Sequence, residues 1–138
     1  MKQLGVILAL LSAVAWAFWG VFSKLSTNRG MPPTTLAFLA SCVSFIVVVG
    51  AYAWQRFPAA PTRASVLLAL LSGLCGAIGL LCFSLAIQRG DAAIIVTLSA
   101  IYPAFTLLLS PFLLQEQLSL THALGVLLVT LGIILVTR

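Results

Sequence analysis

Five long apolar segments dominate the sequence and limit what the chain can fold into. They cover about residues 4–22, 34–54, 65–87, 92–114 and 120–136, and every charged residue lies outside them. A helix crosses the hydrocarbon core of a bilayer with about 20 apolar residues. Transmembrane strands would alternate apolar and polar residues, and these segments do not. The sequence therefore predicts an all-α integral membrane protein, with five transmembrane helices in a single domain over residues 1–138.

The charged residues are too few for a water-facing surface. The chain is 62% hydrophobic and 7% charged, whereas a soluble domain carries about 25% charged residues. The seven Lys and Arg outnumber the two acidic residues. They stand singly between apolar segments, an arrangement typical of anchors at lipid headgroups. We therefore expect membrane lipid as a partner and no nucleic acid.

The basic residues divide almost evenly between the two sides of the predicted membrane domain. Five crossings would place the chain ends on opposite sides, with three basic residues on the N-terminal side and four on the other. The first set is Lys2, Arg56 and Arg63, and the second is Lys24, Arg29, Arg89 and Arg138. Because positive charge sets orientation, a difference of one sets it poorly. We expect copies of the chain to insert in both orientations.

The fourth segment contains Tyr102-Pro103 near its middle. Proline removes one backbone donor, and no bulk water replaces the lost bond at that depth. The helix must then be supported by a neighbouring helix, by water, or by a hydroxyl such as Ser99 or Thr106. A packing kink and a bend beside a solute pathway both fit this pattern.

Catalytic chemistry has little support in the sequence. The two acidic residues, Asp91 and Glu116, stand at segment boundaries, and His122 lies near the start of the fifth segment. A metal site needs clustered ligands, and a nucleophile needs a base and an orienting partner. Proton-coupled carriers use an acid within the membrane, and no segment has one at its centre. We expect no enzyme, no metal site and no cofactor.

Within the apolar segments, the side chains that could contact a solute are aromatic and hydroxyl groups. Trp16, Trp19 and Ser23 share one helical face because they are three and four residues apart. Tyr102 and Phe105 lie in the fourth segment beside the proline. Such a lining would suit an apolar or amphipathic solute. Helix packing and an interfacial aromatic belt are the structural alternatives.

Three stretches resemble one transporter family. Ala13–Lys24 (AVAWAFWGVFSK) resembles the opening of an EamA domain of the drug/metabolite transporter superfamily. Phe83–Ala93 (FSLAIQRGDAA) resembles its passage from the third helix to the fourth, and Ile101–Leu135 resembles its C-terminal signature. One departure is Gln115, which stands before Glu116 where the family usually has glycine.

The resemblance implies a multi-pass transporter of a bacterial or archaeal cell (inner) membrane. Typical members have two five-helix repeats of opposite orientation and carry metabolites or drugs, often outward. A chain with one repeat would complete the ten-helix, inverted-repeat bundle as an antiparallel homodimer and work by alternating access. The resemblance implies Trp16, Trp19 and Tyr102 for substrate binding, and Pro103, Lys24 and Glu116 for a hinge or gate. Ser99 and Phe105 complete the predicted substrate-binding set as the hydroxyl and aromatic residues beside the proline.

Three alternatives remain open at this point. A flippase for lipids or lipid-linked sugars would use a lateral groove with basic residues at one headgroup level. A membrane subunit without transport activity would pack against a larger partner. The transporter could also pair with a sister half instead of an identical copy.

Overall fold

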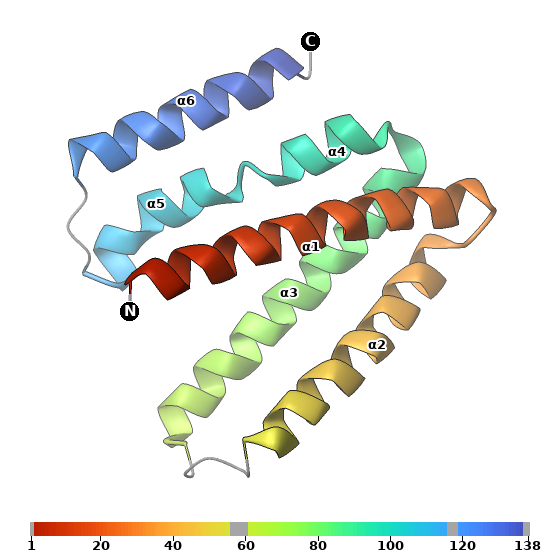
Figure 1. Ribbon diagram of the computed structural model, residues 1–138, viewed down its shortest axis with the longest axis horizontal. Coiled ribbons are helices and arrows are strands. Elements are labelled where there is room, and N and C mark those ends of the chain that lie inside the picture. The colour runs from red at the N-terminus through yellow and green to blue at the C-terminus, as the bar shows by residue number, and fades with distance from the viewer. Residues whose placement is uncertain (1, 56–60, 116–118, 137–138) are drawn as a thin grey trace. The chain divides into compact units, whose positions relative to one another are not determined.

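A computed structural model describes residues 2–55, 61–115 and 119–136, and this part of the chain is helical without strands (Figure 1). The helices are α1 (Lys2–Asn28), α2 (Pro33–Trp54), α3 (Arg63–Arg89), α4 (Ala92–Ser99), α5 (Tyr102–Leu113) and α6 (Leu120–Val136). Four described stretches are long and apolar enough to cross a membrane: Gln3–Asn28, Pro33–Trp54, Arg63–Arg89 and Ala92–Leu113. Leu120–Val136 is a shorter apolar helix. The predicted all-α fold is confirmed.

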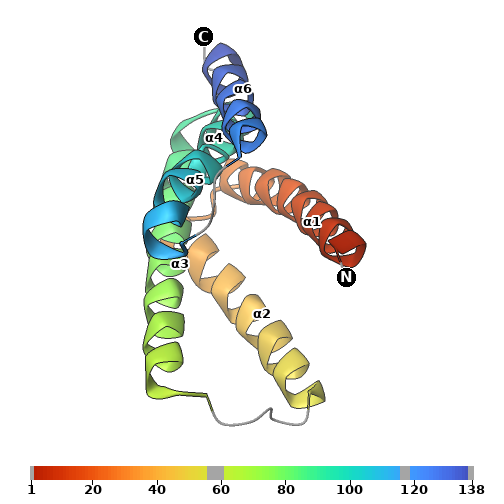
Figure 2. The same cartoon turned by 90° about the vertical axis from the view of Figure 1, so that its left-hand side faces the viewer.

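The helices form two compact units. Unit 1 is Met1–Arg89, with α1 to α3, and unit 2 is Gly90–Arg138, with α4 to α6. The single domain predicted for residues 1–138 stays a prediction. Within unit 1, α2 contacts α3, and α1 contacts both. The helices α2 and α3 are nearest where α2 begins and diverge toward the connection between them (Figure 2). Within unit 2, α6 packs against both α4 and α5.

The tightest packing of unit 1 lies where α1 and α3 end and α2 begins. Ser84 and Ile87 of α3 are fully buried, and Ser23 of α1 and Ala37 of α2 are each 3% exposed. Helices in lipid cannot associate through the hydrophobic effect, so small side chains at the contact allow their backbones to approach. Serine and alanine at three of these four positions fit that requirement.

Glycine fixes the end of α1. Gly30 has φ +87°, a conformation that side chains with a Cβ rarely adopt. The N–H of Met31 donates to the Ser26 carbonyl over 3.2 Å, and the N–H of Gly30 donates to the Thr27 carbonyl over 3.0 Å. These two bonds are the Schellman pattern, which satisfies the last carbonyls of a helix. The chain then turns directly into α2, whose first residue is Pro33.

The fourth predicted segment is interrupted in its middle. A turn at Ala100 and Ile101 separates α4 from α5. The N–H of Ile101 donates to the Leu98 carbonyl over 3.2 Å, and that of Ala104 to the Ile101 carbonyl over 3.0 Å. Pro103 lacks an N–H, and its ring disfavours an α-helix running through the preceding turn. The interruption therefore precedes the proline, and Pro103 itself lies in the first turn of α5, where its missing donor costs little.

A second proline leaves its helix intact. Pro111 lies inside α5, which continues to Leu113. In an α-helix, the N–H of residue 111 would donate to the carbonyl of Leu107. The hydroxyl of Ser110 donates to that carbonyl instead, over 3.2 Å, and Ser110 is 5% exposed. A side-chain donor thus replaces the lost backbone donor.

Gln115 takes a left-handed conformation after α5, with φ +55°. It follows the C-cap residue Leu114, whose N–H donates to the Ser110 carbonyl over 2.9 Å. Glycine is the usual residue at such a position because it has no Cβ. The departure noted in the sequence therefore falls where the backbone conformation favours glycine.

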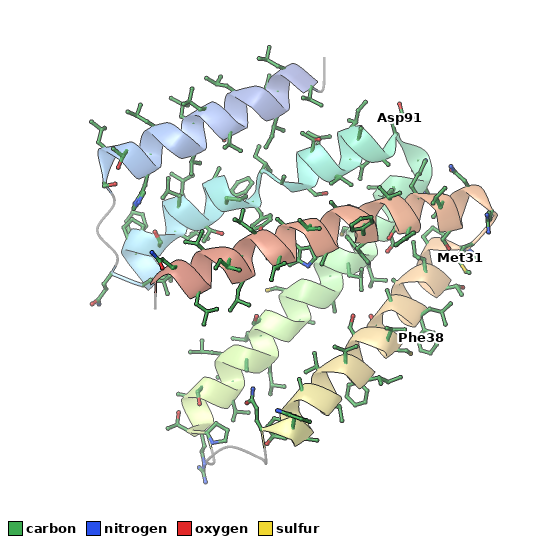
Figure 3. All side chains as sticks on the ribbon, in the orientation of Figure 1. Met31, Phe38 and Asp91 are labelled. Carbon is green, nitrogen blue, oxygen red and sulfur yellow. The ribbon has the colours of Figure 1, made fainter. Side chains whose placement is uncertain are left out.

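Large apolar side chains project outward along the helices (Figure 3). Phe38 of α2, for example, is 66% exposed. Among the described residues, the buried apolar ones are Ala37, Ile87 and Ile133. An apolar exterior of this kind suits a chain surrounded by hydrocarbon.

Candidate functional site

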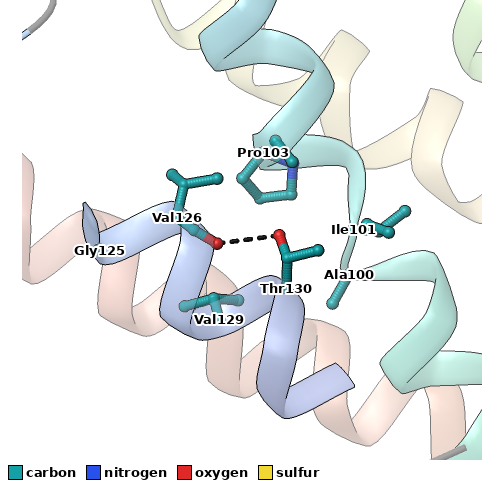
Figure 4. A pocket seen from close by; sticks show the side chains of 8 residues that line it. Ala100, Ile101, Pro103, Gly125, Val126, Val129 and Thr130 are labelled. Atoms are coloured by element: carbon teal, nitrogen blue, oxygen red, sulfur yellow. Dashed lines mark hydrogen bonds between the residues drawn. The ribbon is translucent and has the colours of Figure 1, made fainter. Parts of the chain in front are cut away.

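A small cavity lies beside the turn between α4 and α5 (Figure 4). Its volume is about 130 Å³, and all of its lining belongs to unit 2. The turn and the start of α5 form one wall, and α6 forms the other. The lining residues are Ala100, Ile101, Pro103, Ala104, Gly125, Val126, Val129 and Thr130.

The α6 wall is a single helical face. Its residues are three and four apart, and the buried Ile133 continues the same row toward the end of the helix. Thr130 supplies the hydroxyl of this wall, and that hydroxyl donates to the Val126 carbonyl over 2.9 Å (Figure 4). The cavity surface is therefore mainly apolar, and its volume of about 130 Å³ has room for one apolar group rather than a whole drug-sized ligand, whose pockets measure about 300–1,000 Å³.

Metal chemistry finds no support among the described residues, which contain no group of three or more His, Cys, Asp or Glu able to hold an ion. The three cysteines are free. The acid Asp91 immediately precedes α4, away from the cavity lining.

Of the residues predicted in the fourth segment, Pro103 lines the cavity. Ser99 ends α4, and its hydroxyl donates to the Ile95 carbonyl over 2.8 Å. Tyr102 and Phe105 are 54% and 60% exposed and stand outside the cavity lining. Their proposed contact with a substrate stays a prediction.

The two predicted tryptophans belong to unit 1. Trp19 is half-buried, and its ring centroid lies 4.5 Å from that of Phe83 on α3, with an interplanar angle of 31°. Trp16 is 59% exposed, one turn earlier on α1. The contact of Trp19 with Phe83 joins α1 to α3, and substrate binding by either tryptophan stays a prediction.

The two other residues predicted for a gate are Lys24 and Glu116, and the structure describes the first of them. The ammonium of Lys24 donates to the Ile87 carbonyl over 3.0 Å, so this side chain connects α1 to the last turn of α3. The last carbonyls of a helix lack backbone donors and lie at the negative end of its dipole. Lys24 therefore caps α3 from a neighbouring helix. Glu116 lies outside the described residues.

The α6 wall was missing from the predicted site. Gly125, Val126, Val129 and Thr130 carry no chemical signature, so sequence reasoning did not select them. The useful signal was the small and β-branched residues at helical spacing, opposite a proline in the preceding segment. Their common face indicates a contact surface of α6, although the spacing does not specify which helix packs against it.

These features define a multi-pass helical membrane protein with a broken helix beside an apolar cavity. The sequence matches the EamA-like transporter family over residues 3–138. The chain belongs to that family, as the resemblance predicted. No solved structure matches it.

Three similar proteins have been found, and two of them are named as transporters. An uncharacterized protein of Methanocaldococcus jannaschii is 30% identical over 132 residues, which are 96% of this chain and 95% of that protein. An uncharacterized transporter in the cobO 3′ region of a Sinorhizobium species is 30% identical over 138 residues, covering 98% of this chain and 97% of the relative. The uncharacterized transporter YvbV of Bacillus subtilis is 29% identical over 135 residues, 96% of this chain but 44% of that protein.

Proposed function

We propose that the protein exports small apolar or amphipathic molecules across a bacterial or archaeal cell membrane. It works by alternating access as an antiparallel homodimer. The turn at Ala100 and Ile101, with the cavity beside it, carries the proposal. Irregular backbone at membrane depth is tolerated where it is buried in protein or lines a cavity, and broken helices build the midplane sites of many transporters. The turn lies near the middle of the span Ala92–Leu113, as such a site requires.

The pairing of two copies rests on charge and on the lengths of the relatives. Three basic residues against four give little preference for either orientation. The matched segment covers nearly all of two relatives but less than half of the Bacillus subtilis transporter. Proteins with one such segment and proteins with room for two therefore occur in the same family. Two oppositely inserted copies would supply the inverted repeats on which alternating access depends.

The cavity proposal is tested by filling the cavity with a large side chain. Val126 is half-buried and lines the cavity, so Val126→Trp would occupy the space opposite Pro103. Leu128→Trp is the matched control, because Leu128 is on the same helix, 69% exposed and outside the lining. Purified protein in liposomes would be assayed for the release of fluorescent amphipathic dyes that are neutral, cationic or anionic.

We expect neutral amphipathic dyes to be released fastest, because the lining holds no charge. V126W should lower that rate at least about 10-fold, a loss of about 1.4 kcal/mol in transition-state stabilisation, while L128W keeps it. Equal rates in the two variants would remove the cavity from the pathway. Movement of labelled phospholipid between leaflets, without dye release, would favour a flippase.

A further inference from the structure

A second hollow lies in unit 1, at the end of α1, and no role has been assigned to it. Its volume is about 630 Å³, and it combines apolar side chains with one guanidinium. Its lining, called here the α1-end groove, consists of Phe22, Leu25, Ser26, Arg29, Gly30, Met31 and Pro32. Met31 is half-buried in the connection to α2 (Figure 3).

The shape of this groove is set by the backbone. The Schellman bonds from Met31 to Ser26 and from Gly30 to Thr27 reverse the chain immediately after Arg29. Pro32 precedes the first residue of α2. Leu25 and Phe22, about one and two turns before Arg29, are 50% and 63% exposed. The groove is therefore apolar toward the middle of the span and basic at its end.

Charge favours an anion at this end of unit 1. Lys24 lies just before the last turn of α1, Arg29 directly follows α1, and Arg89 ends α3. Residues 1–89 contain no Asp or Glu, and the single acid nearby in the sequence is Asp91. The ammonium of Lys24 donates to the Ile87 carbonyl, and the guanidinium of Arg89 donates to the Leu85 carbonyl over 3.4 Å. Arg29 is exposed and belongs to the groove itself. A guanidinium binds phosphate with two parallel donors.

We propose that the α1-end groove binds one anionic phospholipid, with its phosphate on Arg29 and an acyl chain along Phe22 and Leu25. A helix end at the headgroup level places a basic side chain beside lipid phosphates. A free anion would use Arg29 but would gain nothing from the apolar part of the groove. This lipid is a bound ligand of unit 1 and is independent of the transport proposed for unit 2.

The test is native mass spectrometry of the detergent-solubilised protein with equal amounts of phosphatidylglycerol and phosphatidylcholine. We expect one phosphatidylglycerol to be retained in preference to phosphatidylcholine. Arg29→Gln should lower that preference about 5-fold, because a basic residue at the membrane surface contributes roughly that factor. Arg63→Gln is the matched control, since Arg63 is also exposed but starts α3 and lies outside the groove.

A second pair of variants tests the apolar part. Leu25→Asn should lower the retention of phosphatidylglycerol, whereas Leu10→Asn, at a 62% exposed position outside the groove, should not. Excess inorganic phosphate should leave the lipid bound. The proposal is overturned if R29Q behaves like the unsubstituted protein, if R63Q lowers the preference equally, if L10N and L25N behave alike, or if inorganic phosphate displaces the lipid.

Discussion

The ammonium of Lys24 on α1 donates a hydrogen bond to the main-chain carbonyl of Ile87 on α3, over 3.0 Å. Ile87 is fully buried and Lys24 is half-buried, so water competes weakly for this bond. The cation also meets the negative end of the α3 dipole. One side chain thus fixes the ends of two helices relative to each other.

Removing this bond should destabilise the protein. Lys24→Met keeps an apolar stem and loses the donor, and we expect the free energy of unfolding to fall by about 1.5 kcal/mol. Lys24→Arg keeps a donor and should lose less. Unfolding in mixed detergent and SDS measures the change, with Arg63→Met as an exposed control. Equal losses for K24M and R63M would contradict a specific role for the bond.

Ser110 and Pro111 should be coupled. Ser110→Ala leaves the Leu107 carbonyl without its donor, and we expect a loss of about 1–2 kcal/mol. Pro111→Ala restores a backbone N–H to that carbonyl, so Ser110→Ala should cost less than about 0.5 kcal/mol in the P111A background. The same unfolding assay on the double-mutant cycle measures the coupling. Additive losses would show that the hydroxyl does not replace the missing N–H.

Gln115 should be a position where glycine stabilises the protein. A left-handed φ of +55° costs an L-residue about 1–2 kcal/mol, so Gln115→Gly should raise the free energy of unfolding by about 1 kcal/mol. Gly30→Ala, at φ +87°, should lower it by a similar amount. A loss of stability in Q115G would be incompatible with the described backbone at this residue.

Pro103 should matter more for movement than for stability. Pro103→Ala restores an N–H at the interruption and allows α4 and α5 to join. We expect slower hydrogen exchange at residues 100–102 and 104 and a release of amphipathic dye at least about 10-fold slower, because a hinge stiffens. Pro111→Ala is the matched proline control and should keep the rate. Unchanged exchange and transport in P103A would remove Pro103 as a hinge.

The sequence predicted the helical spans well because membrane helices depend on length and composition, which are local properties. Pro103 also indicated that the backbone of the fourth segment is irregular near its middle. The exact place of the interruption was harder, because a proline disturbs the turn before it as well as its own position. The structure accordingly places the turn at Ala100 and Ile101.

The contacts between helices were beyond local patterns. Nothing in the residues around Lys24 indicates that its partner is a carbonyl 63 residues later. The α6 wall of the cavity is equally hard to predict from the sequence. The residues Val126 and Val129 do not show that their face of α6 packs against α5. Such pairings follow from packing, which one-dimensional periodicity does not contain.

Orientation is the property that tests the transport proposal most directly. Two variants with a strong charge bias can be made. The first combines Gln3→Lys and Gln55→Lys, which add positive charge on the N-terminal side, with Arg89→Gln, which removes it from the other side. The second combines Arg56→Gln and Arg63→Gln, which remove positive charge from the N-terminal side. Each should insert one way only, as reporter fusions at the C-terminus would show.

The decisive measurement is dye release by cells that express these two variants separately and together. Antiparallel pairing predicts less than about a tenth of the normal rate for either variant alone, because alternating access needs inverted repeats, and recovery when both are present. Full activity from one variant alone, with all copies in one orientation, would contradict the account.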